Sequence, residues 1–327
     1  MSSLSFSRAP APGRVIANMK VRMLPRPSLL LFSIVLFRSV LLAQLDAGRV
    51  IPADHPLHVV AFGDFGTGDE HQKAVAAALA LRNSQERFDT GITMGDNFYL
   101  CGVRSVKDSK WKNRWENLYT PLGFPFYASL GNHDYGNPPI ICPAQRGSPD
   151  SEVAYTAHSK SWRMPARYYT YKAGPVQFIA IDTEGWTDAQ LEWIKQTLAA
   201  SASDPEVKWR IVYGHHPIYT SGVHLNERRI GELRLKLLPV LKAAHVDLYI
   251  CGHDHDLEHL RSEGMEFLIC GGGGAKLRGF WHKDPLSVFT DSTHAFLDIN
   301  IDSHKVTARF LDVNLKSLED PVMTVSK

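Results

Sequence analysis

Five apolar runs in this 327-residue chain each end in a glycine that is followed at once by a side chain able to bind a metal ion. Aliphatic and β-branched runs of this length, bounded by glycine, are typical of buried strands. Ligands collect just beyond the carboxyl ends of such strands, and glycine lets the backbone turn there. The sequence therefore predicts one metal site that gathers Asp64, Asp96, Asn132, His215 and His253.

The short motifs around these positions add two further donors. They read GDFG, GDNFY, GNHD, VYGHH and GHDH in chain order, which brings in Tyr99 and His255. Oxygen and imidazole donors without thiolates suit iron, zinc or manganese. These side chains are too many for one ion, whereas two ions that share a carboxylate fit their number, which is the layout of two-metal phosphoester hydrolases.

The elements that must position these residues are predicted from hydrophobic periodicity. Strands separated by helices come first and paired strands come late, which indicates an α/β sandwich of two sheets flanked by helices. Residues 142–167 contain Pro, Ser and Gly without periodicity, so we expect a loop there. We expect helices near residues 70–84, 109–118, 187–200 and 230–244, and strands near 57–63, 90–94, 126–130, 168–172, 176–181, 209–213, 246–251, 266–270, 294–300 and 304–311.

The ordered set of motifs resembles the purple acid phosphatases, within the calcineurin-like metallophosphoesterases, and is most similar to the small tartrate-resistant mammalian type. The resemblance spans Leu57 to Asn300 and keeps GDNFY, GNHD and GHDH in the family order. It implies a four-layer α/β/β/α sandwich of two mixed sheets flanked by helices. It also implies hydrolysis of phosphate monoesters at an acid optimum, by direct attack of a metal-bound hydroxide at a dinuclear Fe(III)–M(II) centre.

Ligand roles follow from the same resemblance. It assigns Asp64, Tyr99 and His255 to a ferric ion, and it makes Asp96 a bridge to the second ion. That second ion, which would be ferrous iron, zinc or manganese, is completed by Asn132, His215 and His253. A tyrosine phenol loses its proton in acid only beside a strong Lewis acid, since free tyrosine titrates near pH 10. The alternative for Tyr99 is aromatic packing beside Phe98.

Residues next to the ligands are expected to act on the substrate. His133 matches the family histidine that assists the leaving group, and His224 aligns with a second histidine of the animal enzymes. The resemblance implies that Asn132, His133 and His224 bind the substrate. We expect Asp134 either to hold His133 in place or to cap a turn.

Other polar residues have two open interpretations. We expect His216, beside a ligand, to be a solvent-edge or packing histidine rather than a ligand. The run Gly271–Gly274 leads to Lys276 and Arg278, which either line the substrate entrance or belong to a solvated turn. The remaining histidines show no ligand spacing and are expected at the surface, for example His58, His71 and His282.

Residues 1–45 are predicted to be an export leader. Basic residues including Lys20 and Arg22 precede the apolar run SLLLFSIVLF, which is the pattern of a signal peptide. The protein is therefore expected to be secreted or periplasmic, with a membrane-anchored segment as the alternative. Residues 1–18 are interpreted as an extension upstream of a start at Met19 or Met23, and residues 46–327 as the catalytic domain.

Charge and cysteine content restrict the expected partners. The formal net charge is +2, and the residues after the leader contain 30 basic and 34 acidic side chains, so no nucleic-acid partner is expected. We expect small phosphorylated substrates, a monomer, and no stable membrane association after removal of the leader. Cys101 and Cys142 either form a disulfide or stay free, whereas Cys251 and Cys270 are expected to be free thiols in buried strands.

One departure from the family bears on the cleft. The animal enzymes carry a long restraining loop before the helix AQLEWIKQTL, whereas this chain has almost no insertion after IDTEGW. We expect a more open cleft and no activation by proteolysis there. Two alternatives stay open: a manganese- or zinc-dependent phosphodiesterase or nucleotide pyrophosphatase on the same scaffold, and an iron-binding protein with incidental hydrolysis.

Overall fold

The computed structural model describes residues 46–137, 142, 147–320 and 323–327, all of which lie in one compact unit. The expected leader, residues 1–45, lies outside the described residues. A search of the described part of the chain finds no helix that is long and apolar enough to cross a bilayer.

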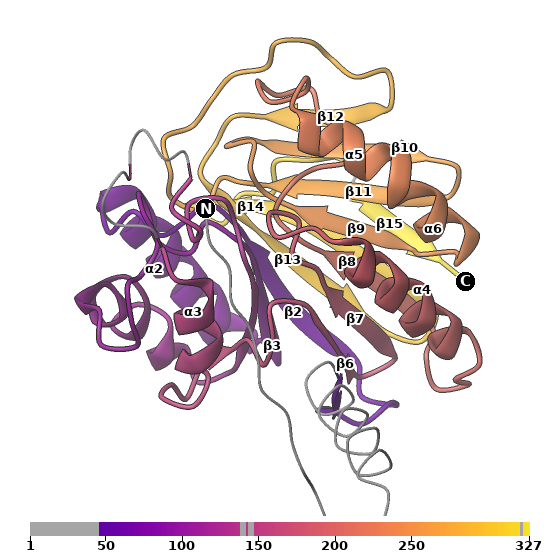
Figure 1. The fold of residues 1–327 in the computed structure, drawn as a ribbon, viewed down its shortest axis with the longest axis horizontal. Coiled ribbons are helices and arrows are strands. Elements are labelled where there is room, and N and C mark those ends of the chain that lie inside the picture. Colours follow the sequence, from indigo (N-terminus) through magenta and orange to yellow (C-terminus); the bar gives the residue numbers. More distant parts are fainter. Residues whose placement is uncertain (1–45, 138–141, 143–146, 321–322) are drawn as a thin grey trace, which may run out of the picture. The chain divides into compact units, whose positions relative to one another are not determined.

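The larger of two mixed sheets has eight strands in the order β1-β6-β7-β8-β9-β11-β10-β12 (Figure 1). The strands β7, β8, β9 and β11 run parallel in its centre, and the remaining pairings within it are antiparallel except for β1 with β6. Its strands are β1 (Asp46–Arg49), β6 (Tyr169–Ala173), β7 (Val176–Ala180), β8 (Trp209–Tyr213), β9 (Leu248–Cys251), β10 (Leu257–Ser262), β11 (Met265–Cys270) and β12 (Ser287–Asp291).

The second sheet has seven strands in the order β15-β14-β13-β2-β3-β4-β5. Here β2, β3, β4 and β5 run parallel, and β13, β14 and β15 join them as antiparallel neighbours. Its strands are β2 (Leu57–Phe62), β3 (Thr90–Met94), β4 (Phe126–Ser129), β5 (Trp162–Arg163), β13 (Ala295–Ile301), β14 (Lys305–Asp312) and β15 (Met323–Ser326).

Helices cover the outer faces of the two sheets (Figure 1). On one side, Ile194 and Leu198 of α4 pack in an apolar cluster with Val212 of β8. On the other side, Val75 and Leu79 of α2 belong to the larger cluster that includes the core of the seven-stranded sheet. The expected α/β/β/α layering is thus confirmed, with α2 (Glu70–Gln85), a π-helix (Trp111–Glu116), a 3-10 turn (Thr120–Leu122), α3 (Pro149–Tyr155), α4 (Asp188–Ala202), α5 (Arg228–Lys236) and α6 (Leu238–Ala243).

All ten expected strands are present, but the helix predictions need correction. The loop expected over residues 142–167 contains α3, which begins where Ser148 caps the amide of Ser151 and Pro149 takes the first helical position. The single helix expected over residues 230–244 is two helices, because Pro239 cannot donate the amide hydrogen bond that a continuous helix requires. The strands that were missed are β1, β5, β10, β12 and β15.

His58 was wrongly expected at the surface. Its ring is buried between Phe88, at a centroid distance of 4.1 Å, and Asp298, whose Oδ2 lies 3.2 Å from Nε2. Asp298 lies on β13, the strand that pairs with β2, and Arg82 of α2 also reaches it at 2.6 Å. The pairing of distant segments therefore buries this histidine, while His71 and His282 are exposed as expected.

A buried histidine in β10 should make the stability depend on pH. Nδ1 of His259 lies 2.6 Å from Glu319 and Nε2 lies 2.8 Å from Glu266, which also accepts a hydrogen bond from Arg261. Burial lowers the pKa of His259, but the two carboxylates outweigh it and raise the pKa overall. This stabilisation is present in full below the unfolded pKa near 6.5 and is lost as the pH rises through the higher folded value.

We therefore expect His259→Gln to lower the melting temperature more at pH 5 than at pH 9. Thermal unfolding across this range, with the exposed His304→Gln as control, measures the effect. An equal loss at both values would contradict it.

Candidate metal centre

The candidate ligands lie where the two sheets meet. Asp64, Asp96 and Asn132 follow β2, β3 and β4, which are adjacent in the seven-stranded sheet, and His215 and His253 follow β8 and β9, which are adjacent in the eight-stranded sheet. Hydrogen bonds join the two edges: the His253 amide donates to Asp64 Oδ2 at 2.9 Å, and the His215 ring donates from Nδ1 to Met94 O at 2.8 Å.

Close packing of backbone at these strand ends requires glycine. A Cβ on Gly252 would lie 2.1 Å from Asp64 Oδ2, and one on Gly131 would lie 2.2 Å from the Asp96 amide nitrogen. The left-handed backbone falls on candidate ligands themselves, with φ of 57° at Asp64, 51° at Asp96 and 71° at His253. Such conformations cost about 1–3 kcal/mol each and concentrate at functional sites.

One group of donors gathers around Asn132. Its Oδ1 lies 2.9 Å from His215 Nε2 and 3.1 Å from His253 Nδ1, and the two ring nitrogens are 3.1 Å apart. The amide nitrogen of Asn132 points the other way, to the carbonyl of Asn137. Three potential ligand atoms therefore face one small volume.

The outer contacts of these rings decide which nitrogens carry hydrogen. His215 Nδ1 faces the Met94 carbonyl and His253 Nε2 faces Glu227 at 2.8 Å, and both partners accept hydrogen bonds. Each neutral ring must therefore carry its hydrogen on that outer nitrogen, which leaves a lone pair on the inner one. Lone pairs of two imidazoles and one amide oxygen repel at these distances, so the donor set fits a cation placed among them.

A second group gathers around Tyr99. Its hydroxyl lies 3.2 Å from Asp64 Oδ1 and 3.0 Å from His255 Nε2, while His255 Nδ1 faces the Lys276 carbonyl at 2.8 Å. Tyr99 thus turns its oxygen toward the other donors, although it also contacts the ring of His133 at a centroid distance of 4.4 Å. Packing and ligation are compatible in this position.

Asp96 lies between the two groups. Its Oδ1 is 3.5 Å from His215 Nε2, and potential ligand atoms of Asp64, Asp96 and His215 all lie within 4.8 Å of one another. Burial raises the pKa of Asp96, but His215, His133 and the amide of His133 outweigh it and lower the pKa. A carboxylate held in its ionised form between two donor groups fits a bridge between two cations.

Burial and neighbouring charges also shift the pKa values of the other donors in this cluster. Burial and then the neighbouring Asp96 charge raise the pKa of Asp64 well above its usual range, and burial with both carboxylates does the same to the pKa of Tyr99. Burial and then His216 and His215 hold the pKa of His253 well below its usual range. Two acids, a phenol and neutral imidazoles in one buried site match the needs of multivalent cations.

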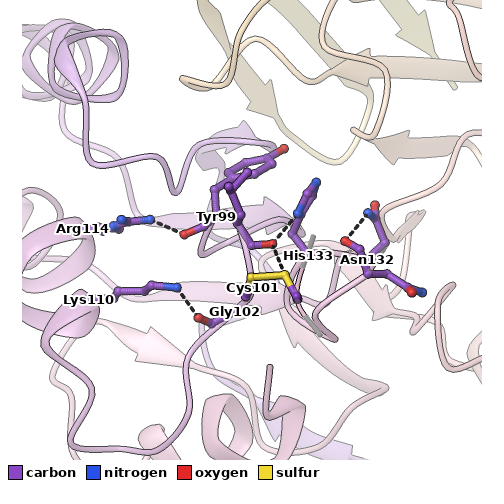
Figure 2. The surroundings of a disulfide bond; sticks show 10 residues. Tyr99, Cys101, Gly102, Lys110, Arg114, Asn132 and His133 are labelled. Atoms are coloured by element: carbon purple, nitrogen blue, oxygen red, sulfur yellow. Dashed lines mark hydrogen bonds between the residues drawn. A yellow bond between two sulfur atoms is a disulfide. The ribbon is translucent and has the colours of Figure 1, made fainter. Parts of the chain in front are cut away.

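His133 lies at the rim of this cluster. Its amide donates to Asp96 Oδ1 at 2.9 Å and its Nδ1 faces the carbonyl of Leu100, while its Nε2 lies 3.9 Å from Asp96 Oδ2 and the ring lines the cavity. Figure 2 shows how the segment that carries this carbonyl is held: the disulfide Cys101–Cys142 anchors it, and Arg114 donates to the Tyr99 carbonyl. The open question about these two cysteines is thus settled as a disulfide, and Cys251 and Cys270 are free and buried as expected.

Asp134 stabilises a turn instead of contacting the His133 ring. It is fully buried, and its carboxylate accepts hydrogen bonds from the amides of Gly131, Asn97 and Phe98 at 2.8–3.2 Å. Burial and the Asp96 charge raise its pKa to about 7. Of its two expected roles, the structure supports the turn cap.

His224 faces the same cavity and is oriented by Asp254. Its Nδ1 lies 2.7 Å from Asp254 Oδ1, and Arg278 Nη1 contacts the opposite nitrogen. Thr220 donates to the other oxygen of Asp254 at 2.6 Å, so the carboxylate is fixed on both sides. Sequence reasoning missed Asp254, although its position between the two histidines of GHDH is a usable signal.

His216 is buried beside its ligand neighbour. Its Nδ1 lies 2.8 Å from Thr183 Oγ1, and the two rings of His216 and His253 have centroids 4.3 Å apart. The ring was expected at the solvent edge or in packing, and its burial agrees with packing. A second group of potential ligand atoms nevertheless includes this ring, together with Glu227 and His253.

A cavity of about 930 Å³ opens above both donor groups. It is lined by Asn132, His133 and His224, and also by the cations Arg228, Lys276 and Arg278. The glycine run before Lys276 packs against the first strand end, where the Gly273 amide donates to Gly63 O at 3.1 Å. The segment is thus a tight turn, and Lys276 and Arg278 after it line the cavity.

Known proteins resemble this chain over most of its length. The model of the calcineurin-like phosphoesterase family matches residues 57–257. Purple acid phosphatase 7 of Arabidopsis thaliana is 30% identical over 290 residues, 80% of this chain and 84% of that protein. Tartrate-resistant acid phosphatase type 5 of Rattus norvegicus is 27% identical over 327 residues, 85% and 93% of the two chains. A purple acid phosphatase from yellow lupin seeds, which shares 18% identity, aligns with a TM-score of 0.65 over 84% of this chain and 54% of that chain.

Two sheets that meet in a cluster of oxygen and imidazole donors, together with these matches, define a metal-dependent phosphoesterase. The chain belongs to the calcineurin-like phosphoesterases and, within them, to the purple acid phosphatases, which confirms the resemblance inferred from its motifs. It is a phosphoric monoester hydrolase of the acid phosphatase class.

The disulfide should support both stability and the placement of His133. A bridge across 41 residues contributes about 4 kcal/mol in the chain-entropy account, and its removal also frees the Leu100 carbonyl that orients the ring. We expect the double variant Cys101→Ser, Cys142→Ser to unfold at lower temperature and to lose turnover more than substrate affinity.

Thermal unfolding and steady-state kinetics measure the two effects, and wild-type protein treated with a thiol reductant should behave like the variant. Unchanged turnover in a clearly destabilised variant would show that the bridge does not position His133.

Proposed function

We propose that this acid phosphatase hydrolyses small phosphate monoesters at a dinuclear Fe(III)–M(II) centre. The observation that carries the proposal is the arrangement of the donors in two groups, one around Tyr99 and one around Asn132, with Asp96 between them. A buried phenol that faces a carboxylate and an imidazole is the feature that favours ferric iron in the first group.

The ligands divide accordingly. We infer that Asp64, Tyr99 and His255 would hold the ferric ion. Asn132, His215 and His253 would hold the second ion, which would be ferrous iron, zinc or manganese, and the Asp96 carboxylate would be shared by the two ions. When bound, such a pair of cations neutralises the phosphate and supplies a water acidic enough to act as the nucleophile at low pH.

The residues around the centre bind the substrate and move the proton. Lys276 and Arg228 line the cavity and have no ion pair within the described part of the chain, so both are available to attract a phosphate dianion. Asn132 and His224 face the same space. In its doubly protonated form, with the Nδ1 hydrogen donated to the Leu100 carbonyl, His133 can present a proton on Nε2 to the departing alkoxide.

A phosphodiesterase is the second candidate, because the cavity offers more space than one phosphoryl group needs. The short connection between β7 and α4, residues 181–187, carries no long loop over this space. The iron-binding alternative has no use for a histidine such as His133 beside the ligands. Rates on p-nitrophenyl phosphate and on its bis ester, measured from pH 4 to 8, separate the three: the proposal expects preference for the monoester and an acid optimum.

Loss of His133 should impair turnover without loss of metal. A positioned proton donor contributes about a hundredfold or more, so we expect His133→Ala to lower kcat by at least that factor. The metal content should stay at the wild-type level, because the ring of His133 belongs to neither donor group.

The exposed His304→Ala is the matched control and should keep full activity. Wild-type turnover of metal-loaded His133→Ala would remove this residue from the mechanism.

A further inference from the structure

Each of the three candidate histidine ligands has its outer nitrogen held by an acceptor. For His215 and His255 the acceptor is a backbone carbonyl, that of Met94 or Lys276, both at 2.8 Å. For His253 the acceptor is a side chain, the carboxylate of Glu227, also at 2.8 Å. Of these three acceptors, only the Glu227 side chain can be removed by a substitution, because the other two are backbone carbonyls.

The Glu227 side chain makes this contact instead of capping the helix α5 that it precedes. It is the N-cap residue of α5, where a carboxylate normally accepts hydrogen bonds from the first amides, yet it makes no side-chain cap. Its Oε2 instead reaches His253, and its Oε1 lies 3.9 Å from Nε2 of His224. The side chain is 41% exposed and lines the cavity, so its position does not depend on filling the core.

We propose that Glu227 is a positioning residue that sets the affinity for the second cation. By accepting the Nε2 hydrogen of His253, it fixes the tautomer whose Nδ1 lone pair faces Asn132 and His215, and its charge makes that nitrogen a stronger donor. The proposal rests on the proposed metal centre. Outer carboxylate partners of ligating histidines typically change metal affinity by about 10–100-fold.

A direct role of Glu227 as a ligand is the competing use of the same atoms. Potential ligand atoms of His216, Glu227 and His253 lie within 4.8 Å of one another, so they form a possible further cation site. A cation at that site would bind Nε2 of His253, while Nδ1 of the same ring would bind the second cation of the proposed centre. Both nitrogens of one ring would then have lost their hydrogen, which makes an imidazolate. The contact between Nε2 and the Glu227 carboxylate, in contrast, needs only a neutral ring that keeps its hydrogen on Nε2.

The test is a zinc titration of the protein that holds its first metal, in competition with a chromophoric chelator. Glu227→Gln keeps a neutral acceptor and Glu227→Ala removes it, so zinc affinity at the second position should fall in the order wild type, Gln, Ala, with a loss of about 10–100-fold for Ala. Glu232→Gln makes the same charge change on the same helix, where Glu232 pairs with Arg229 at 2.8 Å, and should bind zinc as the wild type does. The melting temperature of each variant without metal verifies that it folds.

Three results would overturn the proposal. Equal zinc affinity in the wild type and both Glu227 variants would show that the contact has no effect on the second cation. A third zinc ion in the wild type, lost in both Glu227→Gln and His216→Gln, would make Glu227 a ligand of a separate site. A wild type that takes up no second metal would contradict the proposed function itself, and that outcome is distinguishable because it does not require any variant.

Discussion

The site depends on one physical constraint: the lone pairs of several oxygen and nitrogen donors point into the same buried space between the strand ends. Three imidazoles turn one nitrogen outward to an acceptor and the other inward, where an amide oxygen, two carboxylates and a phenol also point. In the absence of positive charge this arrangement is unfavourable, since burial and mutual repulsion raise the pKa of Asp64 and Tyr99. The packing of the fold must therefore outweigh the repulsion between these groups and hold them in positions where they can bind cations.

The two sheets fix the positions of these donor groups. Each contributes parallel strands whose ends reach the same place, and the glycines after them let one strand end approach another within a distance that any side chain would prevent. The strained backbone at Asp64, Asp96 and His253 is maintained by apolar clusters on both sides of the sheets. Around this rigid centre lie the adjustable parts: the loop held by the disulfide, which supports His133, and the start of α5, which presents Glu227.

The sequence indicated most of the donor residues that the structure brings together, because Asp64, Asp96, Asn132, His215 and His253 each follow a local signal, an apolar run with a terminal glycine. Tyr99 and His255 came from the motifs around these positions. The sequence also predicted ten strands within one or two residues. The predictions were wrong or incomplete where contacts between distant segments of the chain determine the structure. His58 is buried by Asp298, which is far away in the chain. The strand β10 is defined by its pairing with β11, and β12 by its pairing with β10, and not by a periodic pattern. Glu227 has no local signal, since only folding brings it to His253. The capping pattern Ser148–Pro149 that starts α3 was available and was missed.

The visible absorption spectrum of the purified protein reports whether Tyr99 binds ferric iron in a two-metal centre. A tyrosinate bound to ferric iron absorbs visible light and colours the protein, so the account predicts a broad purple or pink band in the wild type. The band should disappear in Tyr99→Phe while the metal content remains near two ions per chain. A colourless wild type that contains two metal ions and prefers diesters would contradict the account and favour a manganese or zinc phosphodiesterase.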